Sequence, residues 1–487
     1  QAKRDNTEKQ RWSVTRSKDG KSFIIKNAWS GKVLNLNGSA AAGTAITALK
    51  ANAKASQAFV LRKSGIVDTG AYQLSTLLNK KFVLYAPKAK KGTQVAIAKK
   101  NSTKLNQRFY VRAEADGKYS IQSVATGMFI ADVKGKAVLM PWSNSDKSLL
   151  WDCTYAAALQ FLNASTGKAM LVSGGKAESK APVATGAAGS GKAKKWSYLS
   201  KPLIATSTYA IKGANGNALE VANGSYAKGA NVRTAAKASA SGSNCFEVQA
   251  EGKYFRLVNT KTYQAVAVKG AYKKAGTNVA QVPVASKKAQ LWKATIGRDG
   301  TITFVNAKSK MAMQVAGKNG NVNQGKATSS KSQAFTLKPV KRYSLSGNTT
   351  LDKNVATILS AYTSLRSCFS YVTNFSYREG ARFYSGPHYL SEATTISYAN
   401  DMVAHHSGNC YRFASLFSWL ARGLGYSSKV ANGHVPSASG GLAPHGWTWI
   451  YTADGTYICD PDLNHEMPGH NWYMTTVGGA PTTYGYW

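Results

Sequence analysis

An aromatic signature recurs along the first 340 residues at a nearly constant spacing. In several copies a glutamine stands two residues before the aromatic residue, as in Gln10/Trp12 and Gln290/Trp292. The central aromatics are Trp12, Phe59, Phe109, Trp151, Trp196, Phe246, Trp292 and Phe335, at spacings of 47, 50, 42, 45, 50, 46 and 43 residues. A period in this range indicates repeated supersecondary units, which must pack against one another to bury a core. Residues 1–340 are therefore predicted to form a repeat architecture.

The repeated units are predicted to consist of short strands. In segments such as 119–124, 254–259 and 301–306, successive residues alternate in character, and this alternation is typical of half-buried strands. Gly, Ser, Thr and Asn are abundant between these segments, as expected for many turns. We expect the signature aromatics to fill the core of each module.

The repeat resembles the ricin-type β-trefoil repeat, whose mark is Gln-x-Trp near the end of each unit. The resemblance covers about two thirds of the chain; some units keep the glutamine with Phe, and others lack it. Three units make one trefoil, and longer lead-ins occur at 66–72 and 202–209. We therefore predict β-trefoils at 66–200 and 201–340. Residues 1–65 would be a partial trefoil remnant without its first unit, and this remnant should expose apolar surface.

The resemblance implies a sugar site built from an acidic residue in an early loop and an aromatic platform. Asp132 keeps this acid, and Glu220 comes near it. The other corresponding positions read Asn35, Tyr85, Ala267 and Gln314. Carbohydrate binding by Asp132 and Glu220 is therefore one interpretation. A spacer or an electrostatic adhesion module is the other.

The positive charge is confined to the repeats. Residues 341–487 hold nine Lys or Arg and eight Asp or Glu, so nearly all of the net charge of +41 lies in residues 1–340. Such an excess favours an anionic partner, or a solvated face that opposes aggregation. The excess is mostly Lys and is diffuse, whereas nucleic-acid readers concentrate Arg on one element. We predict an anionic cell-surface polymer or glycan as the partner, and no nucleic acid.

The sequence also bears on the compartment. No stretch reaches the roughly 18 apolar residues of a membrane helix, so no transmembrane segment is predicted. The chain starts at Gln1 without a Met, so we expect a processed start, at which any signal peptide would already be missing. The five cysteines are too few for a disulfide scaffold, and they do not fix the redox compartment. With the basic modules, this indicates a secreted or surface-attached bacterial protein.

The C-terminal part has a different pattern, and all seven histidines lie in it. Apolar residues at helical spacing predict one amphipathic helix over 351–369. A second apolar stripe starts at Cys410, and we expect Gly423 and Gly425 to end that helix. Cys410 is then the first residue of a helix, where the backbone dipole and free N–H groups favour a thiolate.

A predicted hairpin follows Cys410. His445 is near the start of one strand, Asp454-Gly455 form the turn, and Asp460 is near the end of the second strand. A two-residue loop pairs Trp449 with Asp460 and puts His445 and Asp460 on one face. Nucleophilic catalysis by cysteine needs a thiolate, an imidazole that exchanges its proton, and a carboxylate that orients the imidazole.

This segment resembles the transglutaminase-like cysteine enzymes. The resemblance covers about residues 350–475 and rests on the following motifs: Gly408-Asn-Cys410, Leu424-Gly-Tyr426, Asn432-Gly-His434, His445-Gly-Trp447 and Cys459-Asp460-Pro461. It implies an α+β catalytic domain at 341–487, with Cys410 as nucleophile, His445 as base and acid, and Asp460 as the orienting carboxylate. The family includes crosslinking transferases, peptidases and inactive members.

Other residues are weaker candidates. His434, Trp447 and Trp449 could line a substrate groove, with structural packing as the alternative. The spacing of His405, His406, His465 and His470 matches no tight ligand pattern, so we predict no metal site and no cofactor. The backbone N–H of Cys410 is a candidate oxyanion donor.

The whole chain is thus expected to be multidomain, with β-trefoil modules that target a C-terminal α+β enzyme. The enzyme would cleave or transfer acyl groups of a peptide or protein through a thioester, with hydrolysis slightly favoured over transfer. The alternative is a non-enzymatic adhesin or carbohydrate-binding protein whose last domain is a relic. In a third interpretation, the lysine-rich repeats donate amines to the protein's own crosslinking domain.

Overall fold

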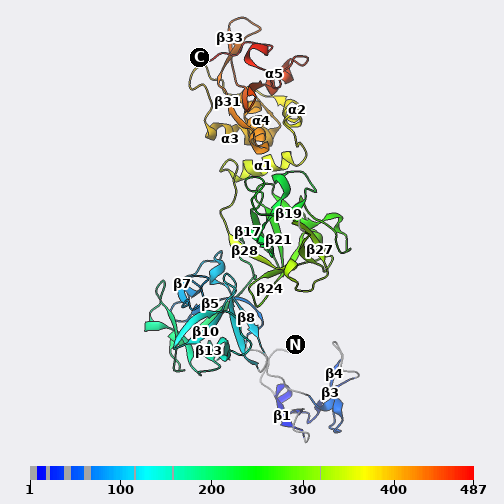
Figure 1. The fold of residues 1–487 in the computed structure, drawn as a ribbon. Coiled ribbons are helices and arrows are strands. Elements are labelled where there is room, and N and C mark those ends of the chain that lie inside the picture. Colours follow the sequence, from blue (N-terminus) through cyan, green and yellow to red (C-terminus); the bar gives the residue numbers. More distant parts are fainter. Residues whose placement is uncertain are drawn as a thin grey trace. The chain divides into compact units, whose positions relative to one another are not determined.

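The computed structural model describes residues 8–17, 22–37, 45–59, 67–114, 117–155, 158–317 and 320–487. The chain divides into two compact units: Gln1–Asp68 with Ala113–Gly117, and Thr69–Arg112 with Lys118–Trp487. The second unit contains two β-modules and then a domain of helices and short strands (Figure 1). The predicted fold class is confirmed. The domain boundaries stay predictions, and the one at residues 65 and 66 lies outside the described residues.

The first unit contains a small antiparallel sheet. Its strands are β1 (Trp12–Arg16), β2 (Phe23–Asn27), β3 (Val33–Leu36) and β4 (Ile46–Leu49), paired in that order. Trp12 is 41% exposed and Ile46 is 55% exposed, so the expected exposure of apolar surface is confirmed. The expectation that Trp12 fills a core is wrong, because the strands described here form only a single layer.

Two modules of twelve described strands each form the all-β part of the second unit. The strands of the first are β5 (Gly70–Thr76), β6 (Phe82–Tyr85), β7 (Ala96–Lys99), β8 (Phe109–Ala113), β9 (Tyr119–Ser123), β10 (Phe129–Val133), β11 (Lys136–Met140), β12 (Leu150–Tyr155), β13 (Leu159–Asn163), β14 (Ala169–Val172), β15 (Val183–Gly186) and β16 (Trp196–Lys201). Those of the second are β17 (Ser207–Gly213), β18 (Ala218–Val221), β19 (Val232–Ala235), β20 (Phe246–Glu251), β21 (Tyr254–Asn259), β22 (Gln264–Val268), β23 (Val279–Pro283), β24 (Trp292–Ile296), β25 (Ile302–Asn306), β26 (Ala312–Ala316), β27 (Asn321–Gly325) and β28 (Phe335–Pro339). The last strand of each module pairs with the first.

Hydrogen bonds explain the repeated signature. The buried side chain of Gln290 accepts from the Ala285 N–H at 2.9 Å and donates to the Pro283 carbonyl at 2.7 Å, which fixes the preceding loop. Two residues later, the fully buried Trp292 donates its indole N–H to the Val266 carbonyl at 3.0 Å. The same pair of glutamine bonds is made by Gln57, Gln107 and Gln333. In the units of Phe109, Trp292 and Phe335, the signature thus couples loop closure to core packing.

A ring of three asparagine side chains closes one end of the second module. Asn231 donates to Asn321 Oδ1 at 3.0 Å, Asn321 to Asn278 Oδ1 at 2.9 Å, and Asn278 to Asn231 Oδ1 at 2.8 Å. These residues come from successive units, 47 and 43 positions apart. Each amide therefore has one donor and one acceptor satisfied by its counterparts.

The C-terminal domain is built around one buried helix. Its helices are α1 (Thr349–Leu359), α2 (Leu365–Thr373), α3 (Glu392–His405), α4 (Cys410–Leu424) and α5 (Pro461–Glu466). Its strands are β29 (Ser376–Tyr377), β30 (Ser407–Gly408), β31 (Ser427–Val430), β32 (Gly433–Pro436), β33 (Leu442–His445), β34 (Thr448–Thr452) and β35 (Gly455–Cys459). Twelve of the fifteen residues of α4 are buried, and Gly425 ends it in the left-handed conformation. The predicted helix start at Cys410 is confirmed, although Gly423 lies inside the helix.

Two other expectations for this domain were wrong. The single helix predicted over 351–369 is two helices, because Ser364 forms a capping box with Ser367 and starts α2. In the hairpin, Thr452 pairs with Gly455, so Ala453-Asp454 form the turn and Trp449 pairs with Ile458. His445 belongs to a separate hairpin, in which β33 pairs with β32.

No helix among the described residues is both long enough and apolar enough to span a membrane.

Candidate active site

Cys410 is held at the start of α4. The preceding Asn409 is the N-cap residue, and its side chain donates to the Ala381 carbonyl at 2.9 Å. As the first helical residue, Cys410 has a backbone N–H without a partner inside the helix. Its thiol accepts a hydrogen bond from the Gly446 N–H and interacts with the side chain of His445. The residue is 5% exposed and lies among the residues that line a pocket.

His445 and Asp460 meet although they do not lie on paired strands. His445 is the last residue of β33, and Asp460 caps α5 by accepting from the Leu463 N–H at 3.0 Å. The Nε2 atom of His445 is 2.7 Å from Oδ2 of Asp460, and both residues are buried. This leaves Nδ1 as the ring nitrogen available to Cys410.

The electrostatics of the pair suit proton transfer. Burial lowers the pKa of His445, but the charges of Asp460 and Cys410 outweigh it and hold this pKa well above its ordinary value. Burial raises the pKa of the Cys410 thiol, and His445 and the Gly446 N–H offset this only in part. Both groups share one proton, so they titrate as a pair.

The other cysteines have different surroundings. All five cysteines lie among the described residues, and none of them forms a disulfide. Burial raises the pKa of Cys368 and of Cys459 to about 12, so both stay protonated. Cys410 is the thiol that a histidine faces.

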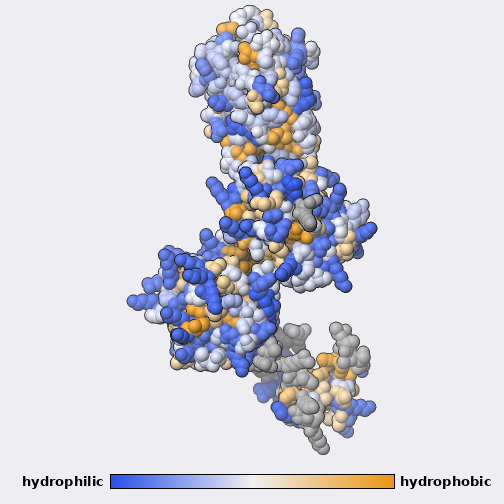
Figure 2. Space-filling view, viewed as in Figure 1, coloured by the Kyte–Doolittle hydropathy of each residue, from blue (hydrophilic) through white to orange (hydrophobic). Residues whose placement is uncertain are grey.

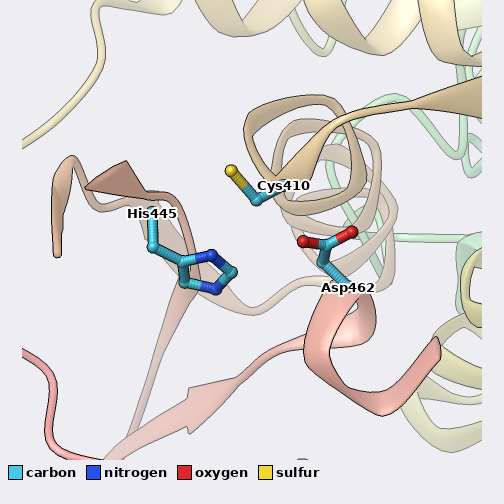
Figure 3. Close-up of side chains that lie close together, drawn as sticks. All are labelled: Cys410, His445 and Asp462. Carbon is cyan, nitrogen blue, oxygen red and sulfur yellow. The ribbon is translucent and has the colours of Figure 1, made fainter. Parts of the chain in front are cut away.

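Asp462 is a site residue that the sequence analysis missed. It lies in the first turn of α5, is 2% exposed and borders the pocket beside Cys410 and His445 (Figure 3). Burial raises its pKa well above the ordinary value of a carboxyl group. The available signal was its position, two residues after Asp460 and directly after a proline at the helix start.

The pocket has a volume of about 530 Å³ and opens beside the thiol. It is lined by α5, by the β32–β33 hairpin and by Tyr377 of β29. The parallel pairing of β29 with β30 places Tyr377 opposite Gly408, two residues before Cys410. Arg382 donates a hydrogen bond to the Tyr377 side chain, so the Tyr377 O–H proton can point elsewhere.

The groove candidates lie away from this pocket. Trp447 is fully buried in a cluster with Ala431 and Ile458, and Trp449 donates to the Tyr486 hydroxyl at 2.8 Å. None of His434, Trp447 and Trp449 is among the residues that line the pocket. Their groove role stays a prediction, and their contacts indicate packing.

The last residues of the chain pack onto the catalytic-like site, which the sequence analysis did not foresee. Gly485 forms an antiparallel bridge with His434. This places the Tyr484 hydroxyl 2.9 Å from Oδ2 of Asp460, the oxygen that also contacts His445. Tyr484 is thus a second partner of Oδ2 beside His445, while the Leu463 N–H donates to Oδ1.

The two sugar-site candidates have internal partners. Asp132 accepts from the hydroxyls of Thr166 at 2.6 Å and Thr185 at 2.7 Å. Glu220 is fully buried, pairs with Arg233 at 3.0 Å and accepts from Ser239 and Ser243. Sugar binding through these carboxylates stays a prediction, and the geometry favours a structural role for both.

Among the described residues, the histidines other than His445 do not form a metal-binding cluster. His405 contacts Asp401, and His465 contacts the Thr373 carbonyl. In the described part of the chain, the group of His, Cys, Asp or Glu residues that could hold a metal is Cys410, His445 and Asp462. This is a different set from the one considered in the sequence.

Comparisons with known families identify both parts of the chain. Residues 1–49 and 245–346 match the ricin-type beta-trefoil lectin domain-like family, and residues 349–461 match the transglutaminase-like superfamily. The chain therefore carries a ricin-type β-trefoil lectin-like region, followed by a C-terminal transglutaminase-like domain. Both resemblances inferred from the sequence are confirmed.

More distant similarities were also found. A mosquitocidal holotoxin is 16% identical over 70% of this chain and 42% of its own, with a TM-score of 0.28. The designed 3-fold symmetric protein ThreeFoil is 24% identical over 27% of this chain and 99% of its own, with a TM-score of 0.26. The chain thus spans less than half the length of the holotoxin. A search of curated proteins finds no match.

Proposed function

We propose that the chain is a cysteine enzyme that cleaves or transfers peptide or amide acyl groups through a thioester on Cys410. One observation carries the proposal: His445 lies between Cys410 and Asp460, with its Nε2 atom 2.7 Å from the carboxylate. Nucleophile, proton carrier and orienting carboxylate are thus in contact, as cysteine catalysis requires. The pocket beside the thiol provides room for a peptide substrate.

In the first half of the reaction, the Cys410 thiolate attacks the substrate carbonyl. Imidazolium His445 then gives its proton to the leaving amine, and a thioester remains. The oxyanion needs two donors. The free N–H of Cys410 supplies one, and we assign the other to the Tyr377 hydroxyl, which lines the same pocket. Burial raises the pKa of Tyr377 to about 12, which keeps this donor protonated.

In the second half, neutral His445 accepts a proton from the attacking water or amine. Attack by water gives hydrolysis, and attack by an amine gives crosslinking. The pocket opens to solvent, which favours water as the acceptor, and hydrolysis is therefore the proposed outcome. Asp460 stabilises the imidazolium in both halves and keeps the ring oriented.

The basic modules are proposed to hold the enzyme at an anionic surface. Figure 2 shows hydrophilic side chains over most of the visible face of these modules, whereas the visible face of the C-terminal domain is paler. Lysines spread over such an area suit a charged polymer or glycan better than a single shaped ligand. This supports a secreted or surface-attached protein with a peptide or protein substrate.

The test is Cys410→Ala, with Cys245→Ala as the matched control in the second β-module. Labelling by a thiol-directed mechanism-based probe should map to Cys410 in the unchanged protein. The probe adduct and the amide hydrolysis should both be lost in Cys410→Ala and kept in Cys245→Ala. Normal turnover by folded Cys410→Ala would reject the mechanism, and binding without any turnover would favour an adhesin.

A further inference from the structure

Three side chains that can bind a metal ion lie close together at the N-terminus of α4. Cys410 starts α4, His445 ends β33, and Asp462 lies in α5. Their ligand atoms all lie within 4.8 Å of one another, and all three residues are buried. Figure 3 shows the side chains of Cys410, His445 and Asp462 close together, each coming from a different segment of the chain.

Asp462 supplies independent evidence for a cation site. Its residue is 2% exposed, and its Oδ1 atom has no hydrogen-bond partner. Buried polar atoms are nearly always paired, because an unpaired one costs free energy. The carboxylate borders the pocket, so a cation that entered from solvent could reach it.

We propose that Cys410, His445 and Asp462 bind one Zn²⁺ ion, and that this ion reversibly switches the enzyme off. The inference rests on the proposed function, since the ion would occupy the nucleophile of that reaction. The metal would have three protein ligands and one position open to the pocket.

The donor set fits zinc. Sulfur, imidazole nitrogen and carboxylate oxygen are its usual ligands, at about 2.0–2.3 Å from the ion, so the ligand atoms of a tetrahedral site lie about 3.5 Å apart. Small side-chain rotations would close the observed spacing to this value. Asp460 would hold the metal-bound imidazole through Nε2, as carboxylates commonly do behind zinc ligands. Mg²⁺ and Ca²⁺ prefer six or more oxygen ligands, which this site lacks.

Charge also favours a divalent ion. On binding, the proton shared by Cys410 and His445 and the carboxyl proton of Asp462 are released to solvent, and the thiolate sulfur, Nδ1 and a carboxylate oxygen each donate a lone pair to the metal. The thiolate and the carboxylate are two negative ligands, and they balance the two positive charges of Zn²⁺. No electron is transferred. The bound thiolate cannot attack a carbonyl, and His445 cannot accept a proton at Nδ1, so catalysis stops until a chelator removes the ion.

The experiment measures alkylation of Cys410 in the full-length, metal-free protein by iodoacetamide and peptide mapping. Zinc chloride at ten times its dissociation constant should slow the alkylation about tenfold, and EDTA should restore it. Magnesium chloride should have no effect. Cobalt chloride should produce a thiolate-to-cobalt charge-transfer band in the same protein.

Asp462→Asn should weaken the zinc protection by at least about tenfold, since loss of even an outer partner of a ligand costs that much. Asp454→Asn, in the exposed β34–β35 turn, is the control and should protect like the unchanged protein. Unchanged alkylation in zinc, equal protection of folded Asp462→Asn, or inactivation by EDTA would each overturn the proposal. If Asp462→Asn does not fold, the cobalt band of the unchanged protein decides, and its absence overturns the proposal. A metal-free protein with an unreactive Cys410 would instead reject the proposed function, while the cobalt band still tests the site.

Discussion

Two aspartates that are two positions apart have opposite surroundings. Asp460 accepts hydrogen bonds from His445, Tyr484 and the Leu463 N–H. Asp462 has no partner at Oδ1, and burial raises its pKa well above the ordinary value. Pairs of acids in unlike environments commonly divide their roles. Here the hydrogen bonds of Asp460 orient the imidazole, and Oδ1 of Asp462 is left for an incoming cation.

Tyr484→Phe tests the hydrogen bond from the Tyr484 hydroxyl to Asp460. Loss of this hydrogen bond should loosen the carboxylate that orients His445. A hydrogen bond to a charged group is worth ~1.5 kcal/mol, so kcat should fall roughly tenfold. KM should change little, because Tyr484 does not line the pocket. The measurement is steady-state hydrolysis with a pH profile; equal kcat in Tyr484→Phe and the unchanged protein would contradict this positioning role.

Asp460→Asn tests the charge that supports the imidazolium. The carboxylate raises the pKa of His445, so its removal should lower this pKa and move the alkaline limb of kcat/KM to lower pH. The activity itself should fall by roughly 10³–10⁴-fold, as loss of the orienting acid does in comparable triads. The measurement is the pH profile of kcat/KM for the residual activity. If the alkaline limb stays in place or moves to higher pH, Asp460 is not the cause of the raised pKa of His445.

Tyr377→Phe tests the assigned oxyanion donor. Removal of one such donor typically costs roughly 10²-fold in kcat. Thiol alkylation of Cys410 by iodoacetamide should be unchanged, because that reaction forms no oxyanion. Unchanged amide hydrolysis would assign the donor to another group.

At the scale of elements, the site depends on the N-termini of two helices and on the break between β33 and β34. Cys410 begins α4 and Asp460 caps α5, so each side chain is fixed by its helix. Gly446 and Trp447 separate β33 from β34, and the Gly446 N–H reaches the thiol while His445 contacts Asp460. A side chain does not fit there: a Cβ on Gly446 would lie 2.4 Å from Cδ1 of Tyr411.

Gly446→Ala should therefore push β33 away from α4 and separate His445 from Cys410. We expect loss of most activity and a lower melting temperature. Gly478→Ala is the matched control, because a Cβ there meets no atom within 4 Å. Full activity in Gly446→Ala would mean that this close approach does not position the site.

The sequence predicted the elements that carry strong local patterns. The apolar stripe after Cys410 defined α4, and the repeated Gln-x-aromatic signature defined the modules. The hairpin register was off because Asp454-Gly455 is a strong turn pair, although the turn forms one residue earlier. Tyr377 and Tyr484 were missed because tertiary packing, which no local pattern encodes, brings them to the site. Asp462 had a local signal in its position two residues after Asp460, but its burial beside Cys410 follows from packing.

At the scale of the whole molecule, charge and chemistry are carried by different parts of the chain. The repeats hold nearly all of the net charge of +41, and the transglutaminase-like domain is close to neutral. The proposed attachment through the repeats should therefore change with ionic strength without altering the groups around Cys410.

Full-length Cys410→Ala should adsorb to an anionic polymer such as heparin, and the adsorption should fall steeply between low and physiological salt, where screening shortens to about 8 Å. A neutral polysaccharide of similar size is the control. Hydrolysis of a short uncharged peptide by the unchanged protein should vary much less over the same salt range. Adsorption that does not depend on salt would contradict an electrostatic attachment.

The asparagine ring of the second module has a chemical consequence. Its three amides are bonded head to tail, so the circuit needs a donor at every position. Deamidation of Asn231, Asn278 or Asn321 would replace one NH₂ group by a second oxygen. Two acceptors would then face each other at one link, and a negative charge would appear among half-buried groups. Spontaneous deamidation at any of these three positions should thus break the hydrogen-bonded ring and destabilise the module that precedes the transglutaminase-like domain.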